Sequence, residues 1–315
     1  MAVINGTAGN DDGTGNLPAL VGTADNDIIH GLAGNDILDG AAGSDALFGD
    51  DGSDRLDGGL GSDTLFGGSG DDFLTDSFGV NALYGDDGND VLNSSASGSG
   101  QHLDGGAGND TISISGGSGK LLGGSGDDRL EGGGGSDVLL GGTGSDVMLG
   151  GQGSDFYEVD NVGDVVFEQA GAGIADNVYA YVDFNLPDNV DNLVMLYGNQ
   201  RFGTGNAGDN IIIGNGQSNV IEGGAGYDTL EGGAGSDLFI IRPGFGVDVI
   251  TDFRAGAGSD DAILFSSSLF TSFSQVMAHS AQVGNDTWIG DGLGNTVVLV
   301  GVQQSELHAN DFGWI

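Results

Sequence analysis

Aspartate recurs at every ninth position over two long stretches of this 315-residue chain and again over a short one. Carboxylate oxygens are the ligands that hard divalent cations such as Ca²⁺ prefer in proteins. Their regular spacing predicts rows of similar metal sites rather than a single catalytic centre. The candidate carboxylate ligands are Asp27, Asp36, Asp45, Asp54, Asp63, Asp72, Asp90, Asp110, Asp128, Asp137, Asp146, Asp155, Asp228 and Asp237.

Glycine surrounds each of these aspartates, as in residues 58–63, which read GGLGSD. Because glycine adopts positive φ without a steric penalty, such a turn can direct carbonyl oxygens inward. Calcium takes roughly six to eight oxygen ligands, more than one turn supplies. We therefore predict that aspartates two repeats apart share an ion, with about ten ions in all. The backbone oxygens expected to join them belong to Gly31, Ala33, Gly40, Ala42, Gly49, Asp51, Gly58, Leu60, Gly67, Ser69, Gly123, Ser125, Gly132, Gly134, Gly141 and Thr143.

The exceptions to the nine-residue ladder are not scattered. Asn81, Gln101 and Gly119 stand where aspartate is expected, and all three fall on the same side of a coil made of two repeats. The sequence therefore predicts one continuous row of ions and one interrupted row. Asn210 and Asn219 replace aspartate in the last repeats, where an amide oxygen could still ligate but without the charge. We expect weaker binding there.

The elements that position these residues follow from an apolar residue two places after each aspartate, such as Ile29, Leu38 and Leu47. Apolar residues at this spacing predict a short buried strand, and the glycines between them predict turns. Two consecutive repeats, with their two strands and two turns, then form one coil. The fold predicted is all-β, a parallel β-roll or β-helix solenoid of glycine-rich nonapeptide repeats with a C-terminal β-rich cap.

Breaks in the repeat divide the chain. Ser94 and Ser95 read as a two-residue insertion within the main array. Near the C-terminus we expect a short helix at 272–281, a hairpin from 287–289 and 296–300, and Trp288 and Trp314 in a cap core. The predicted segments are 1–21 (N-terminal cap), 22–158 (calcium-binding roll), 159–204 (spacer of wider coils), 205–240 (second repeat block) and 241–315 (C-terminal cap).

Charge and composition restrict the partners. The chain has 47 acidic and 6 basic residues, a formal net charge of −41. Phosphates would be repelled, so nucleic acid is excluded as a partner and multivalent cations are favoured. There is no cysteine, so rigidity outside the cell would have to come from metal. No apolar run has transmembrane length, and the N-terminus lacks the pattern of a cleavable signal peptide.

The unit that contains Asp63 and its neighbours resembles the RTX family, the haemolysin-type calcium-binding repeats of secreted proteins. The resemblance covers 22–158 and 205–240, and residues 248–253, which read DVITDF, resemble the C-terminal segment of type I secreted proteins. It implies a chain that is disordered in the calcium-poor cytosol and folds outside the cell. It also implies that 241–315 carries an uncleaved signal for the type I secretion machinery, and that the protein is extracellular.

Catalytic motifs are missing from the sequence. It contains no His-Glu-x-x-His zinc helix and no Gly-x-Ser-x-Gly elbow, and its four histidines stand singly. We therefore predict a secreted, non-enzymatic calcium-binding protein with a structural role at the cell surface or in the matrix, where it would bind a surface partner or itself. Two alternatives remain: a host-directed effector resembling the small RTX nodulation proteins, and a calcium-binding carrier module of a larger secreted hydrolase.

Overall fold

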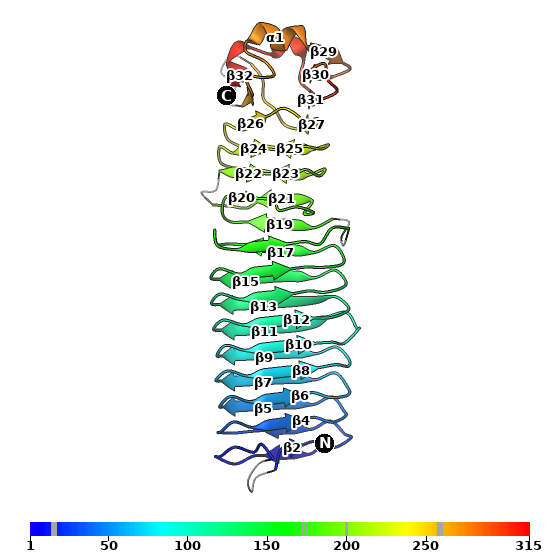
Figure 1. The fold of residues 1–315 in the computed structure, drawn as a ribbon, viewed down its shortest axis with the longest axis vertical. Helices are drawn as coiled ribbons and strands as arrows, with labels where there is room; N and C mark the ends of the chain where they lie inside the picture. The colour runs from blue at the N-terminus through cyan, green and yellow to red at the C-terminus, as the bar shows by residue number, and fades with distance from the viewer. Residues whose placement is uncertain (14–17, 172, 174, 199–200, 257–260) are drawn as a thin grey trace. The chain divides into compact units, whose positions relative to one another are not determined.

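The computed structural model describes residues 1–13, 18–171, 173, 175–198, 201–256 and 261–315. The chain forms two compact units, residues 1–174 and 175–315. Within each unit, short strands stack in parallel, one coil upon the next (Figure 1). The predicted all-β parallel roll is confirmed. Among the described residues, no helix is long and apolar enough to span a membrane.

In the first unit each full coil contributes one strand to each of two parallel sheets. One sheet contains β1 (Val3–Asn5), β3 (Ile28–His30), β5 (Ala46–Asp51), β7 (Thr64–Ser69), β9 (Ala82–Asp87), β11 (Gln101–Ala107), β13 (Gly119–Ser125), β15 (Val138–Thr143) and β17 (Phe156–Val159). The other contains β2 (Leu20–Val21), β4 (Ile37–Asp39), β6 (Arg55–Asp57), β8 (Phe73–Asp76), β10 (Val91–Ser94), β12 (Thr111–Ile114), β14 (Arg129–Glu131), β16 (Val147–Leu149) and β18 (Val165–Phe167).

The register confirms the coil length. Leu47 pairs with Leu65 and Leu38 pairs with Leu56, in each case two repeats further along the chain. These leucines are fully buried, so each sheet contributes a column of apolar side chains to the interior of the roll. Period-two burial along each strand then leaves the intervening side chains on the outer face. On that face His30, Phe48 and Phe66 stack, with ring centroids 4.6 and 4.9 Å apart.

The two-residue insertion lies later than the sequence suggested. Ser94 pairs in register with both Asp76 and Ile114, so it belongs to the strand rather than to an insertion. The extra residues lie in the following turn, because Asp90 is matched by Asp110, 20 residues on. Counting the repeat period cannot locate an insertion within a run of small residues, whereas the pairing of strands in the sheet can.

The second unit repeats the plan with less regular coils. Asn177 pairs with Asn192, 15 residues later, so this coil is shorter than a regular one, whereas Asn192 pairs with Ile211, 19 residues later, in a slightly wider coil. One sheet holds β19 (Asn177–Ala180), β21 (Asn192–Met195), β23 (Ile211–Ile213), β25 (Thr229–Glu231), β27 (Val247–Ile250) and β31 (Thr296–Leu299). The other holds β20 (Phe184–Asn185), β22 (Phe202–Thr204), β24 (Val220–Glu222), β26 (Leu238–Ile241), β28 (Ala262–Phe265) and β32 (Phe312–Trp314).

The C-terminal segment departs from the roll. Its helix α1 (Phe273–Ala278) is capped by the side chain of Ser272 and buries Val276, as the amphipathic pattern predicted. Strands β29 (Ser280–Val283) and β30 (Asp286–Gly290) extend the first sheet of this unit, and β30 pairs antiparallel with β31 as the expected hairpin. Short 3₁₀ turns η1 (Gln304–Glu306) and η2 (Ala309–Asp311) follow. The expectation that Trp288 and Trp314 form a cap core is wrong, because they are 42% and 36% exposed.

Candidate metal centre

The shape of each turn depends on its glycines. Gly70 has φ of +124°, where a residue with a Cβ would be strained. The first glycine of a turn is required for a different reason. A Cβ on Gly31 would lie 2.6 Å from Asp36 Oδ2 and 2.7 Å from the carbonyl oxygen of Gly49. Glycine thus leaves a small space where a carboxylate oxygen and a carbonyl oxygen of the next coil converge.

The aspartates of successive coils are joined by a repeated hydrogen bond. The Asp36 N–H donates to Asp54 Oδ1 at 2.7 Å, and the Asp54 N–H donates to Asp72 Oδ1 at the same distance. On the opposite side Asp27 donates to Asp45 and Asp45 to Asp63. The structure therefore brings together aspartates that lie 18 residues apart, as predicted. One carboxylate oxygen of each aspartate is used in this ladder.

The second oxygen of nearly every ladder carboxylate has no hydrogen-bond donor. The residues concerned are no more than 3% exposed, so these oxygens are shielded from bulk solvent. A buried charged oxygen without a donor or counter-ion costs several kcal/mol, roughly. The affected atoms are the Oδ2 atoms of Asp36, Asp45, Asp54, Asp63, Asp72, Asp90, Asp110, Asp128, Asp137, Asp146 and Asp228. Each such oxygen fits a hard cation, since calcium binds carboxylate and carbonyl oxygens together.

Burial also changes the acidity of the ladder. It raises the pKa of Asp72 to about 7 and that of Asp54 to about 6, and the neighbouring carboxylates Asp90 and Asp36 add to the rise. Backbone N–H groups that donate to these carboxylates oppose the shift only in part. In the absence of a cation, the ionised ladder is therefore costly to bury.

The two classes of predicted carbonyl ligand lie differently. First-position carbonyls face the ladder: those of Gly58 and Gly67 approach the spaces beneath Gly40 and Gly49. Third-position carbonyls already accept a backbone N–H from the preceding coil, as the carbonyl of Asp51 does from Gly34 at 2.8 Å. The same holds for Leu60, Ser69, Ser125 and Thr143. First-position oxygens therefore have more freedom to bind an ion, and the ligand set stays a prediction.

The interrupted row contains amides in place of carboxylates. Asn81 and Gln101 occupy ladder positions, since the Asp63 N–H donates to Asn81 Oδ1 and the Asn81 N–H donates to Gln101 Oε1. Gln101 Nε2 donates to the carbonyl oxygens of Gly79 and Gly98, at 2.9 and 3.2 Å. A side-chain N–H group thus satisfies turn carbonyls that a cation could otherwise bind. Asn210 does the same in the second unit, where its Nδ2 donates to two backbone carbonyls.

At Gly119 an apolar side chain replaces the site. A Cβ on Gly119 would collide with Ile114 Cδ1, so Ile114 fills the space that the aspartate carboxylate has left. Ile114 itself stands where regular coils have a glycine, such as Gly132 in the next one. The nine-residue period reveals only the loss of aspartate. The compensating change is Ile114, five residues earlier in the same turn. A pattern of aspartates alone does not reveal it.

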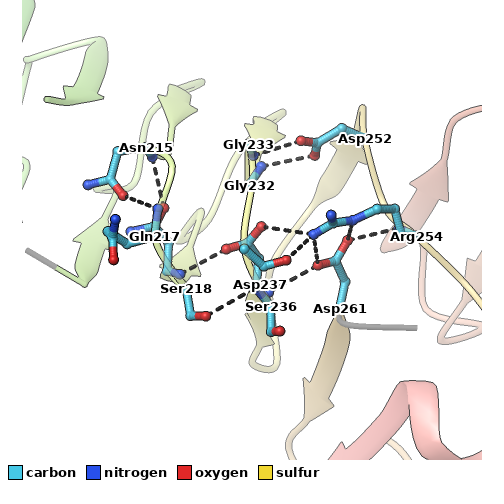
Figure 2. Close-up of polar contacts among 12 residues, drawn as sticks. Asn215, Gln217, Ser218, Gly232, Gly233, Ser236, Asp237, Asp252, Arg254 and Asp261 are labelled. Atoms are coloured by element: carbon cyan, nitrogen blue, oxygen red, sulfur yellow. Dashed lines mark hydrogen bonds and ion pairs between the residues drawn. The ribbon is translucent and has the colours of Figure 1, made fainter. Parts of the chain in front are cut away.

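At the C-terminal end of the ladder in the second unit, an arginine contacts the aspartates (Figure 2). The Asp237 N–H donates to Asp261 Oδ1 at 3.0 Å, so Asp261 continues the ladder. Arg254 Nη2 lies 2.8 Å from Asp261 Oδ1 and 3.8 Å from Asp237 Oδ2, and it also donates to the Gly235 carbonyl. The guanidinium therefore contacts two ladder carboxylates and a turn carbonyl. These are the same groups that converge on the cation position elsewhere.

Asp164, Asp248 and Asp261 are among the ladder residues that the sequence prediction missed. Asp164 accepts a hydrogen bond from the Asp146 N–H at 3.1 Å, and Asp261 accepts one from Asp237. Asp248 lies beside Asp228, and burial raises the pKa of both carboxyls. Asp164 keeps the nine-residue spacing and could have been found from it. The other two follow longer loops, where the period gives no signal.

Comparison with known proteins identifies the repeat. Residues 20–47, 39–74, 57–92, 102–120, 122–157 and 204–239 match the RTX calcium-binding nonapeptide repeat (four copies). Together these segments cover just over half of the chain. The chain is 46% identical over 145 residues to the endo-1,3-1,4-beta-glycanase EglC, and 40% identical over 146 residues to the endo-1,3-1,4-beta-glycanase ExsH, both of Rhizobium meliloti (strain 1021).

Each of these matches covers 46% of this chain and 30% of the relative. The chain thus spans about a third of the length of these curated relatives. Among solved structures, the extracellular lipase LipA from Serratia marcescens is similar with a TM-score of 0.30 and 13% identity, over 85% of this chain and 44% of that one.

Proposed function

The chain belongs to the RTX calcium-binding nonapeptide repeat family, and on that premise we propose that it is a secreted, non-enzymatic protein. In this proposal about ten calcium ions fold the roll and hold it together. The repeats bind calcium, as the family does, and family members of this kind are typically secreted. Its role would be structural, at the cell surface or in the extracellular matrix.

The observation that carries the proposal is the ladder of buried carboxylate oxygens without donors. Most of these atoms, such as Asp54 Oδ2, point into a space that also receives a carbonyl oxygen of the next coil. A metal-free roll would bury these charges uncompensated, at a cost that rises with every coil. About ten calcium ions would add roughly +20 and reduce the formal charge of −41 by half. Folding and calcium binding would then be one process.

Export would precede folding in this scheme. The proposed ion affinities are those of extracellular modules, on the order of 0.1–1 mM per site, which leaves the chain unfolded in a calcium-poor cytosol. The segment 241–315 is proposed to carry the signal for the type I secretion machinery. A chain that lacks this segment is expected to stay inside cells that export the complete chain.

Calcium titration tests the proposal directly. Far-ultraviolet circular dichroism of the chain in chelator should show an unfolded spectrum that becomes β-rich as calcium is added. Isothermal titration calorimetry of the same sample should give about ten bound ions. A β-rich spectrum in chelator that calcium leaves unchanged would contradict the coupling of folding to calcium.

The glycanase relatives favour a second candidate, a carrier module for a secreted hydrolase. Both relatives are named for cleavage of 1,3-1,4-β-glycans, and each extends well beyond the region that it shares with this chain. A carrier would bring about export of a reporter enzyme fused to its N-terminus and would not associate with itself or with cells. Calcium-dependent self-association or retention on the cell surface would favour the structural role instead.

A further inference from the structure

The first defect of the interrupted row lies in the turn of residues 76–81. Regular turns of this side begin with glycine and end with aspartate, as Gly58 and Asp63 do. Here the turn begins with Asp76 and ends with Asn81. The strand pairing of β8 with β10 places Asp76 in the column of first-position residues, so no shift of register explains the change. The turn therefore still contains a carboxylate, but at its first position, five residues before the position where regular turns have it.

The Asp76 carboxylate lies inside the roll. Its residue is fully buried, and Oδ1 accepts a hydrogen bond from the Phe78 N–H at 3.1 Å. Oδ2 has no donor. A Cβ on Gly58 would collide with this Oδ2 and would lie 2.9 Å from Asp63 Oδ2, which also lacks a donor. Two buried carboxylate oxygens, one from each of two successive coils, therefore converge beneath Gly58.

The amide of Asn81 does not neutralise this pair. Its Oδ1 accepts the Asp63 N–H at 3.0 Å, and its Nδ2 donates to the Phe78 carbonyl at 3.0 Å. It therefore preserves the ladder and the shape of the turn. Two buried negative groups that face each other cost free energy unless a counter-charge or a proton lies between them. The equivalent space in the preceding coil is bounded by Asp45 Oδ2 and the Gly58 carbonyl, a carboxylate and a carbonyl.

We propose that Asp76 is a metal ligand that takes over the part of residue 81, so that a calcium ion binds between Asp63 and Asp76. The proposal rests on the proposed calcium function of the roll. With Asp76 as a ligand, this site has two carboxylates, as a regular site has. The stretch of turns without ions then begins at Gln101 rather than at Asn81.

The other two defects do not share this exchange. The turn that ends at Gln101 begins at Ser94, whose Oγ donates to Gln101 Oε1 at 3.3 Å. The turn that ends at Gly119 begins at Ile114, which fills the space by packing. Neither turn has a carboxylate at its first or last position. Asp76 is thus the one member of this set that supplies a carboxylate.

Two variants of the complete chain test the assignment by the number of bound calcium ions, measured by equilibrium dialysis. Asp76→Gly restores the repeat glycine and removes the carboxylate, and we expect it to bind one ion fewer. The double variant Asp76→Gly with Asn81→Asp returns the carboxylate to the sixth position of the turn, and it should regain that ion. Asp57→Asn removes an exposed charge from the same region and should leave the number unchanged.

An unchanged number of ions in Asp76→Gly, together with folding at lower calcium, would overturn the assignment and show that the pair holds a proton. If Asp76→Gly does not fold, the double variant decides: a count below that of the natural chain also overturns the assignment. Failure of the natural chain to bind calcium would refute the proposed function itself. The two failures are therefore distinguishable.

Discussion

The two sides of the first unit are built from the same repeat, but they differ in the residues that stand at the ladder positions of their turns. One side has aspartate at every coil from Asp36 to Asp146, with a donor-free oxygen at each step. The other side replaces the carboxylates at Asn81 and Gln101 by amides whose oxygens still accept the ladder hydrogen bonds, and at Gly119 the Gln101 N–H donates to the Ser118 carbonyl instead. The strands remain in register on both sides. Backbone pairing and the apolar column therefore set the register, and the role of the proposed ions would be to neutralise the turns.

Three kinds of side chain occupy positions where the account would otherwise place an ion. An amide N–H satisfies the turn carbonyls at Gln101, an aliphatic side chain fills the space at Gly119, and a guanidinium contacts two carboxylates at Arg254. Each replacement removes a calcium requirement at one coil. The continuous side should therefore respond more strongly to calcium, and the interrupted side should respond more strongly to changes in packing.

The largest expected effect comes from packing on the interrupted side. Ile114→Ala should lower the free energy of unfolding in saturating calcium by about 2–4 kcal/mol, because a buried side chain is truncated beside Gly119. Chemical denaturation followed by circular dichroism measures this. Thr111→Ala, at an exposed position of the same strand, should change stability little. A reduced number of bound calcium ions in Ile114→Ala would break the comparison, since no ion is assigned there.

The next effect concerns one ligand of the continuous side. Asp72→Asn should raise the calcium concentration at the folding midpoint by about ten-fold, since loss even of an outer partner typically weakens metal binding by 10- to 100-fold, roughly. The matched control is Asp71→Asn, an exposed neighbour whose Oδ1 accepts the Asn89 N–H, which an amide oxygen can also do. Equal midpoints for the two variants would remove the distinction between buried and exposed carboxylates.

A smaller effect is expected at the arginine. Arg254→Gln should lower stability at low calcium by about 1 kcal/mol or less, because the guanidinium is half exposed and its ion pairs are partly screened. High calcium should reverse the loss, as an ion can then take the vacated position between Asp237 and Asp261. Arg242→Gln, which removes an exposed ion pair with Glu222, is the control. A loss that calcium does not reverse would assign Arg254 to packing alone.

Acidity should have the mildest effect, and it should act on both sides, because burial also raises the pKa of Asp137 to about 7 on the interrupted side. Burial raises the pKa of Asp54, Asp90 and Asp110 to about 6 and that of Asp72 to about 7. A carboxyl with a higher pKa in the folded chain favours folding at low pH, and that contribution is lost as pH rises through the folded value. In chelator the chain should therefore gain β structure between about pH 7 and pH 5, which circular dichroism measures. Loss of structure over this range would contradict the expected direction.

Much of this architecture could be predicted from the sequence, because a strict period couples each aspartate to the residue one coil away. The parallel roll, the two-repeat coil and the side of the defects all follow from counting. Asp76 and Ile114 were missed because a single-position pattern does not show substitutions that compensate each other across a turn. Arg254 could not be placed, since it contacts Asp261 seven residues further on, a separation that the nine-residue repeat does not contain.

Ion positions in crystals of the calcium-loaded chain, located by anomalous scattering, test the central claim most directly. The account predicts peaks between each pair of successive aspartates from Asp36 to Asp146, each near a donor-free carboxylate oxygen. It predicts none beside Gln101 or Gly119. An empty continuous side, or ions that line the interrupted turns as regularly as the others, would contradict it.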